Sequence, residues 1–330
     1  MTSPEPRKPP PPIPVSVLTG FLGAGKTTLL NELLQDKGLA GALVLINEFG
    51  EIGLDHLLVE TIDRDMMLMA SGCLCCTIRG ELVDMLEDIL RRLDNGRIKP
   101  FDRIVIETTG LADPAPVMQT YMQHPYLSLR FFPEALVTVV DAVNARSTLQ
   151  RHEEAVRQIA MADRIVLTKT DLLEAQDRSQ TLAALLNGLQ ALSPGAKIFN
   201  KQDGPVSAAD LFTGSPYDPD SKTADVKNWL HLNATTDSIA SHNHLLDHHL
   251  HDHHRHDPNR HDARIRAACL RAEHPLVPAR FEMFIEMLRK VHGKHVLRLK
   301  GIIALADDPH RPLVIHGVQH IFHPPVRLAH

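Results

Sequence analysis

A glycine-rich segment near the start of the chain has the residue types and the spacing that bind phosphate. Residues 20–27 read GFLGAGKT and match the pattern G-x-x-x-x-G-K-[ST]. The glycines let the backbone curl, so that successive N–H groups point at phosphate oxygens. Lys26 supplies a charge for the β and γ phosphates, and the Thr27 hydroxyl is a ligand for Mg²⁺. A helical pattern begins at Lys26, and its positive end faces the same anion. The alternative is a glycine-rich turn without a ligand.

A second segment combines an apolar run with a carboxylate. Residues 103–110 read RIVIETTG, which predicts a buried strand that ends at Glu107 and is followed by a turn through Gly110. A carboxylate at a strand tip can hold Mg²⁺, directly or through water, or orient an attacking water. The N–H of Gly110 is a candidate contact for a γ-phosphate. Many strands end in glutamate, so this pattern alone is weak evidence for a nucleotide site. It becomes informative because it follows the phosphate motif in the chain.

A third segment, residues 168–171 (TKTD), follows another apolar run and has the pattern of a loop that reads guanine. Asp171 would accept from the two donors on the Watson–Crick edge of guanine, and the stem of Lys169 would cover the ring. Adenine lacks this donor pair, so Asp171 favours GTP over ATP. Threonine stands at the first position instead of the commoner asparagine, which is expected to weaken base selectivity. The alternative is that Asp171 caps a following helix.

Three of the four cysteines fall within four positions, at Cys73, Cys75 and Cys76. Thiolates suit Zn²⁺ or Cu⁺, and three of them leave a fourth coordination position open for exchange. One alternative is a buried, inert cluster at a helix start. Another is a redox pair, for which the thioredoxin-like setting is missing. Cys269 lies far along the chain in an apolar pattern and is expected in a core.

Two further segments carry side chains that bind metals. Residues 47–51 (NEFGE) follow an apolar run, and Glu48 or Glu51 is expected to join the transition-metal or the Mg²⁺ shell; a polar loop without a ligand is the alternative. Residues 241–262 have low complexity and are rich in histidine, which chelates Zn²⁺, Ni²⁺ or Cu²⁺ from a flexible chain. Here the alternative is a solvated linker with incidental affinity. The candidate ligands are His242, His244, His248, His249, His251, His253, His254 and His256.

Composition excludes several classes of function. The chain has 330 residues, of which 43% are hydrophobic and 23% are charged, as in ordinary globular proteins. Its net charge of −5 gives no global positive field to attract nucleic acid. No apolar run approaches the roughly 18 residues of a membrane span, and the first 14 residues have no apolar core of a secretion signal. We therefore expect a cytoplasmic protein that binds neither nucleic acid nor membrane.

The chain must also form the elements that position these groups. Apolar runs at 15–19, 42–46, 103–107, 135–141 and 164–168 alternate with helical patterns such as residues 80–93. Continuous apolarity is typical of strands that are buried on both faces. The alternation predicts an α/β fold of the P-loop NTPase type, a doubly wound and mainly parallel sheet with a second, smaller α+β domain.

We expect four parts along the chain: a disordered Pro-rich tail over residues 1–12, a P-loop GTPase domain over 13–205, a linker with the His-rich loop over 206–264, and the small α+β domain over 265–330. In the last part the pattern predicts a strand over 265–271, a helix over 278–291, and strands over 296–305 and 313–322.

Taken together, the motifs resemble a known family. TGFLGAGKTTLLNELL, INEFGEIGLDHLLV, SGCLCCTIRGEL, IVIETTGLADPAPV, VVDAVNA and ADRIVLTKTDL come in the order and spacing of the CobW-like (YjiA-type) family of metal-trafficking P-loop GTPases. HVLRLKGIIAL and PLVIHGVQHIF are similar to the small second domain of that family. Family members usually continue through another strand and helix, so we expect an abbreviated or truncated second domain.

The resemblance implies roles for individual residues. Lys26, Thr27 and Glu107 would be catalytic, and Cys73, Cys75 and Cys76 would bind the metal, with Cys75 and Cys76 the stronger candidates. The nucleotide would be held by Gly20, Gly23, Ala24, Gly25, Lys26, Thr27, Thr28, Gly110, Lys169 and Asp171.

The resemblance also implies an activity: GTP hydrolysis that is coupled to binding a transition metal and delivering it to client metalloproteins. The implied cofactors are GTP or GDP, Mg²⁺, and Zn²⁺ or Co²⁺, and a monomer or weak homodimer is expected. Two alternatives within metal biology are a zinc or cobalt store or sensor with incidental nucleotide binding, and cobalt insertion in corrinoid synthesis. A small-molecule kinase is a third alternative, which the TKTD segment disfavours.

Overall fold

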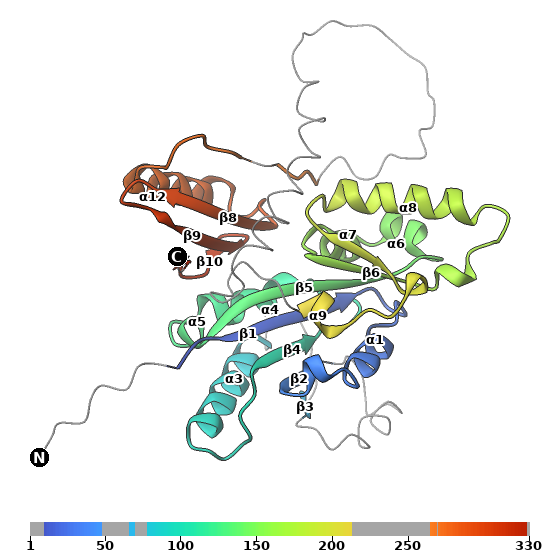
Figure 1. Ribbon diagram of the computed structural model, residues 1–330, viewed down its shortest axis with the longest axis horizontal. Coiled ribbons are helices and arrows are strands. Elements are labelled where there is room, and N and C mark those ends of the chain that lie inside the picture. The colour runs from blue at the N-terminus through green and yellow to red at the C-terminus, as the bar shows by residue number, and fades with distance from the viewer. Residues whose placement is uncertain (1–9, 48–65, 70–77, 213–264, 269, 329–330) are drawn as a thin grey trace, which may run out of the picture.

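The structure is a computed structural model that describes residues 10–47, 66–69, 78–212, 265–268 and 270–328. These residues form two sheets, one before and one after the His-rich segment (Figure 1). Among them, no helix has both the length and the apolar character that a membrane crossing requires.

The larger sheet has seven strands in the order β3-β2-β4-β1-β5-β6-β7, and every pairing between neighbours is parallel. This confirms the predicted doubly wound α/β fold. The strands are β1 (Ile13–Gly20), β2 (Ala42–Asn47), β3 (Met66–Met69), β4 (Arg103–Glu107), β5 (Phe131–Asp141), β6 (Arg164–Thr168) and β7 (Lys197–Asn200).

All five strands that the apolar runs predict are present, because continuous Val, Ile and Leu can be buried on both faces of the sheet. β5 begins earlier than predicted, at Phe131. β3 and β7 were missed. Both are four residues long and lie at the two edges of the sheet. KIFN of β7 has few apolar residues, whereas MMLM of β3 is apolar but short.

Helices cover both faces of this sheet. α1 (Lys26–Leu33) and α9 (Ala208–Phe212) pack into the buried cluster on one face. The cluster on the other face includes residues of α3 (Ile78–Asp94), α4 (Pro114–Gln123), α5 (Leu127–Arg130), α6 (Ala145–Arg151), α7 (Glu153–Ala160) and α8 (Arg178–Leu192). The helical pattern at 80–93 therefore corresponds to α3.

The second sheet is small and antiparallel. β9 (Asp308–Val318) pairs with β8 (Arg298–Leu305), β10 (Ile321–Phe322) and β11 (Val326–Arg327). α12 (Pro278–Met287), extended by one turn to His292, covers one face and buries Phe281 against Leu305 and Ile315. This confirms the smaller α+β domain.

The strand predicted over 265–271 was wrong: residues 265–268 and 270–271 form no strand. Ile265 instead packs against the buried cluster of the first domain, and Leu270 is exposed. The apolar pattern there reflects one anchoring contact rather than strand pairing. The strand predicted over 313–322 is divided, because the chain turns at Gln319, which has a φ of 55°.

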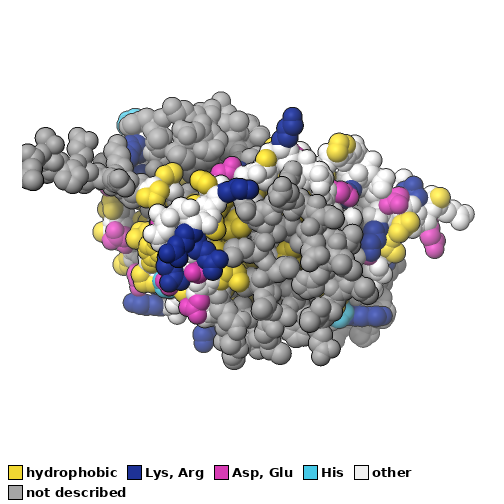
Figure 2. All heavy atoms as spheres, turned by 90° about the horizontal axis from the view of Figure 1, so that it is seen from below, with side chains coloured by type: hydrophobic (Ala, Val, Ile, Leu, Met, Phe, Trp, Pro, Cys, Tyr) yellow, Lys and Arg dark blue, Asp and Glu magenta, His cyan; other side chains and the backbone are white. Residues whose placement is uncertain are grey.

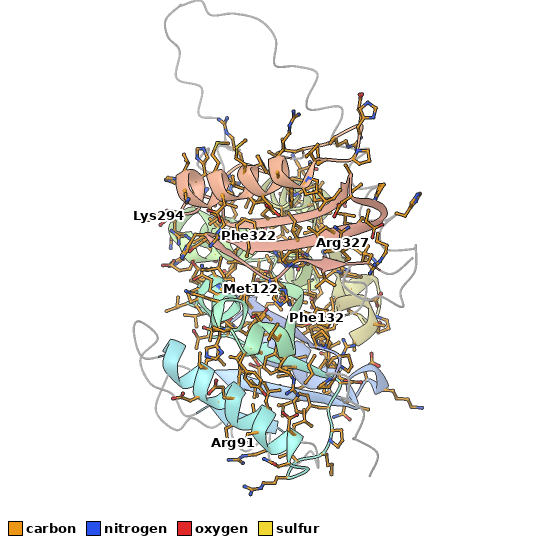
Figure 3. All side chains as sticks on the ribbon, turned by 90° about the vertical axis from the view of Figure 1, so that its left-hand side faces the viewer. Arg91, Met122, Phe132, Lys294, Phe322 and Arg327 are labelled. Carbon is orange, nitrogen blue, oxygen red and sulfur yellow. The ribbon has the colours of Figure 1, made fainter. Side chains whose placement is uncertain are left out.

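The other face of the second sheet lies against the first domain. Val318 and Ile321 belong to the same buried cluster as Tyr121 of α4 and Phe131 of β5. Figure 3 shows this arrangement: Phe322 lies above Met122 and Phe132, and Arg91 of α3 lies at the opposite end of the molecule. The two domains therefore share one continuous apolar core.

Candidate nucleotide and metal site

The phosphate motif lies at the carboxyl end of β1. β1 is flanked by β4 on one side and β5 on the other, so the order of the strands reverses there. In open α/β sheets, ligands bind outside the carboxyl ends of the strands at such a switch point. The topology therefore brings the three predicted nucleotide segments, which follow β1, β4 and β6, to one edge of the sheet.

The backbone of residues 20–26 has the geometry that a phosphate-binding loop requires. A Cβ on Gly20 would lie 2.3 Å from the carbonyl oxygen of Val139, so only glycine fits against β5. Gly25 has a φ of 92°, in the left-handed region, and directly precedes α1. Lys26 is buried at the start of α1, and its Nζ lies 3.4 Å from the carbonyl oxygen of Phe21, across the loop. Ala24 is buried, whereas Thr28 is exposed on α1.

Thr27 and Glu107 meet where a cation would be held. The Thr27 hydroxyl donates to Glu107 Oε1 at 2.8 Å, and Glu107 is buried at the tip of β4. A hydroxyl and a carboxylate are hard oxygen donors of the kind that Mg²⁺ prefers, so this pair fits that ion. Thr108, next in the chain, bonds back to β1, since its hydroxyl donates to the Thr19 hydroxyl at 2.9 Å. These bonds fix the position of Glu107 relative to the phosphate loop.

Gly110 lies directly against the phosphate loop. A Cβ there would be 2.6 Å from the backbone nitrogen of Leu22 and 2.8 Å from its Cα, so no side chain fits. The turn after β4 can therefore approach the position of a terminal phosphate as closely as backbone atoms allow.

The TKTD segment is tied to the same loop. The Thr168 hydroxyl donates to the carbonyl oxygen of Ala24 at 2.8 Å. Lys169 has a φ of 59°, and its Nζ lies 2.8 Å from the carbonyl oxygen of Gly23 and 2.7 Å from Asp141 Oδ2. A base held by this segment would thus be positioned relative to the phosphates by direct contacts.

Asp171 is exposed, as a base-reading carboxylate must be. Its Oδ1 accepts from Gln202 Nε2 at 3.1 Å, and its carbonyl oxygen accepts from Arg178 at 2.7 Å. Residues 172–176 form no α-helix, and α8 begins only at Arg178. The alternative in which Asp171 caps a helix is therefore wrong.

Asp141 is a site residue that sequence reasoning missed. Burial raises the pKa of this carboxyl, but hydrogen bonds from Lys169 and Asn144 outweigh burial, so the pKa lies below its usual range. The resulting anion holds the ammonium group of Lys169 over the phosphate loop. The available signal was the aspartate that ends the apolar run at 135–141.

The predicted transition-metal ligands lie outside the described residues. This holds for Cys73, Cys75, Cys76, Glu48 and Glu51, and for His242, His244, His248, His249, His251, His253, His254 and His256. Within the described part of the chain, no group of three or more His, Cys, Asp or Glu side chains could hold a metal ion. The segments that carry the cysteines and glutamates follow the carboxyl ends of β3 and β2, and β2 pairs with β4 so that Ile46 lies beside Glu107.

A basic hollow at the other end of α3 is separate from this edge. It is lined by Asp88, Arg91, Arg92 and Arg97, and Figure 2 shows basic side chains gathered on the face that carries α3. Asp88 accepts from Arg91 at 2.8 Å and from Arg92 at 2.6 Å. The C-x-C-C segment precedes the amino end of α3, and the 17 residues of the helix span about 25 Å. The hollow is therefore not part of the candidate site.

Comparison with known proteins decides the family. Residues 14–200 match the model of the CobW/HypB/UreG nucleotide-binding domain, and residues 265–330 match the cobalamin synthesis protein CobW C-terminal domain. The chain belongs to the CobW family. Its two domains are the two domains of that family, in the same order.

Relatives carry names that concern zinc. The zinc chaperone YjiA of Escherichia coli is 30% identical over 311 residues, which cover 94% of this chain and 87% of the relative. The zinc-regulated GTPase metalloprotein activator 1 of Schizosaccharomyces pombe is 37% identical over 182 residues, 53% of this chain and 43% of the relative. Among solved structures, the Zn(II)-bound YjiA GTPase from E. coli is 25% identical with a TM-score of 0.57, and the superposition covers 96% of this chain and 89% of that chain.

Proposed function

We propose that this protein is a GTP-hydrolysing metallochaperone of the cytoplasm that binds zinc at its C-x-C-C segment and delivers it to client metalloproteins in a nucleotide-dependent way. One observation carries the proposal: Glu107 and Thr27 meet at the same sheet edge from which the segment with Cys73, Cys75 and Cys76 departs after β3. A change at the phosphates would therefore act at the edge of the sheet where β3, the strand that precedes the cysteines in the chain, ends. The names of the relatives support zinc as the cargo.

In the proposed reaction a water attacks the γ-phosphorus of GTP, the bond to the β–γ bridging oxygen breaks, and GDP and phosphate leave. Lys26 binds the β and γ phosphates, and Gly110 offers its N–H to the γ-phosphate. Thr27 and Glu107 would hold Mg²⁺, which neutralises charge on the phosphate oxygens when it is bound. Asp171 and Lys169 select and cover the guanine base. Thiolates release zinc slowly, and a nucleotide-driven change of the site removes that obstacle.

The test is a competition titration of Zn²⁺ against a chromogenic chelator, with Mg²⁺–GDP and with a non-hydrolysable GTP analogue. Residues 242–261 are deleted, so that loop histidines do not mask the thiolates. We expect zinc affinities that differ by about tenfold or more between the two nucleotides, equivalent to about 1.4 kcal/mol of coupling. Cys75→Ser should abolish the difference, and Cys269→Ser, the matched control, should keep it. Equal affinities in both nucleotide states would overturn the proposal.

A further inference from the structure

The turn between β4 and α4 is held by two consecutive residues of α7. Gln158 Nε2 donates to the carbonyl oxygens of Gly110, at 3.2 Å, and Ala112, at 2.9 Å. Arg157 forms an ion pair with Asp113 at 3.2 Å, and Asp113 caps α4. The turn that approaches the phosphates is therefore positioned by α7, a helix that begins beside the phosphate loop, where the rings of His152 and Phe21 lie 4.4 Å apart.

Gln158 itself is fixed. Its side chain is almost completely buried. Its backbone carbonyl oxygen accepts from the hydroxyl of Thr138 in β5 at 2.7 Å. Because the backbone of Gln158 is bonded to the sheet, its amide can follow a displaced turn only as far as the side chain reaches. If the turn is drawn toward a ligand, either the bonds from Gln158 lengthen or α7 shifts with it.

The far end of α7 lies against the second domain. Met161, directly after the helix, accepts from Arg298 of β8 through its carbonyl oxygen. Asp163 receives Arg298 Nη2 at 2.6 Å and also pairs with Lys300. All three side chains are largely buried between the domains, and the Asp163 carboxylate additionally accepts from the backbone N–H of Leu136 at 2.8 Å. Met161 and Asp163 lie three and five positions after Gln158 in the chain.

α4 gives a second connection from the same turn. Gln119 of α4 donates to Gln319 Oε1 at 2.9 Å, in the turn between β9 and β10. Two helices therefore connect the turn at residues 110–113 to the second domain: α4, which follows the turn in the chain, and α7, which holds it.

We propose that Gln158 is a positioning residue that couples the turn after β4, through α7, to the docking of the second domain. The inference rests on the proposed function, since it takes Gly110 as a contact of the γ-phosphate. The γ-phosphate would then accept from the N–H of Gly110 while Gln158 donates to the carbonyl oxygen of Gly110, so both act on the position of one residue. GTP weakens the bonds from Gln158, α7 loses a restraint, and the contacts of Arg298 and Lys300 with Asp163 are held less tightly. Exchange of GDP for GTP thus loosens the second domain.

Hydrogen exchange of the full-length protein tests this, with Mg²⁺–GDP and with a non-hydrolysable GTP analogue. Exchange of the β8 amides requires local opening of the second sheet, which docking opposes. We expect the peptide covering 298–305 to exchange about fivefold faster or more with the analogue, the lower end of ordinary allosteric coupling. Gln158→Met should remove that difference. Gln190→Met should keep it, since this variant likewise removes a side-chain donor, here from α8 to the carbonyl oxygen of Pro194.

Lys300→Met tests the other end of the connection, should Gln158→Met fail to fold. It leaves Arg298 on Asp163, so we expect faster β8 exchange in both states and a smaller difference between them. Equal or slower β8 exchange with the analogue, or a full difference in Gln158→Met, overturns the inference. Protection of residues 20–30 in the same data reports nucleotide binding. If neither nucleotide protects them, the proposed function fails; if they are protected while β8 does not respond, only the coupling through Gln158 fails.

Discussion

The two ends of β6 both carry ion pairs, and their difference shows how one strand serves two purposes. At the carboxyl end, Lys169 pairs with Asp141 at 2.7 Å, and 37% of the Lys169 side chain stays exposed beside the phosphate loop. At the amino end, Asp163 pairs with Arg298 and Lys300 of the second domain, and only 9% of the Arg298 side chain is exposed. The first pair remains open to a ligand, whereas the second is enclosed between domains.

The enclosed pairs depend more strongly on the charges of their partners than the open pair does. Burial raises the pKa of Asp163, but the charges of Arg298 and Lys300 outweigh burial and hold the pKa far below its usual range. A buried carboxylate with two cationic partners stabilises docking only while all three charges are present. The Lys169 side chain, which is partly exposed, can in contrast be rearranged by a nucleotide.

The largest expected effect is at the enclosed end. Asp163→Asn leaves two buried cations facing a neutral amide, and we expect a loss of about 3–5 kcal/mol in the free energy of unfolding. Urea denaturation measures it. The same substitution at Asp307, whose pairing with Arg327 at 2.7 Å is exposed, is the control and should cost less than about 1 kcal/mol. Similar losses in the two variants would show that the interdomain cluster is not a docking contact.

At the open end, Lys169→Met should act on ligand binding instead. The variant removes the contacts with Asp141 and with the carbonyl of Gly23 and should weaken GDP binding by about 1.5–3 kcal/mol, with a smaller effect on unfolding. Fluorescence titration with a labelled nucleotide measures the affinity. Lys201→Met, which removes an exposed pair with Glu32, should leave it unchanged. Unaltered affinity in Lys169→Met would contradict the assigned role.

Positions that directly follow a buried strand could be predicted from the sequence. The phosphate loop, Glu107 and the TKTD segment each lie within a few residues of a buried strand, so their spacing alone predicts where they meet. The partners of Lys169 and Asp163 lie far apart in the sequence, and no pattern in the chain pairs them. β7 was missed for a related reason: its sequence, KIFN, has too few apolar residues to indicate a strand, and only pairing with β6 defines it.

A change of base preference would show that Asp171, near the carboxyl end of β6, recognises the guanine base. Asp171→Asn replaces an acceptor of two N–H donors with a group that carries one donor and one acceptor. We expect GDP affinity to fall by about tenfold, since a hydrogen bond to a charged group contributes about 1.5 kcal/mol or more. Xanthosine diphosphate has a carbonyl in place of the guanine amino group, so it should bind more tightly to Asp171→Asn than to the unsubstituted protein. Asp203→Asn is the control, and equal losses in both variants would refute the assignment.

The smallest effect is a pH dependence at the enclosed end. Burial, with the charges of Lys300 and Arg298, holds the pKa of His316 well below 6.5, despite Asp163 nearby. The folded protein keeps this imidazole neutral, while the unfolded chain takes up a proton below pH 6.5. The free energy of unfolding therefore keeps its full value above that pH. Below it, the free energy falls by at most about 1.4 kcal/mol per pH unit. Urea denaturation between pH 5 and 7 should show a slope that His316→Gln reduces and that His310→Gln, at an exposed position, retains. An unchanged slope in His316→Gln would contradict this.

The most direct test of nucleotide-dependent zinc delivery measures the release of zinc and of phosphate together in one turnover. Protein loaded with zinc and GTP is started with Mg²⁺, while a fluorescent chelator reports zinc and a coupled sensor reports phosphate. We expect zinc to leave as phosphate leaves, with the same rate constant, and Lys26→Ala, which lacks the phosphate-binding charge, to release neither. Release of phosphate while zinc stays bound would show that GTP hydrolysis does not drive zinc delivery.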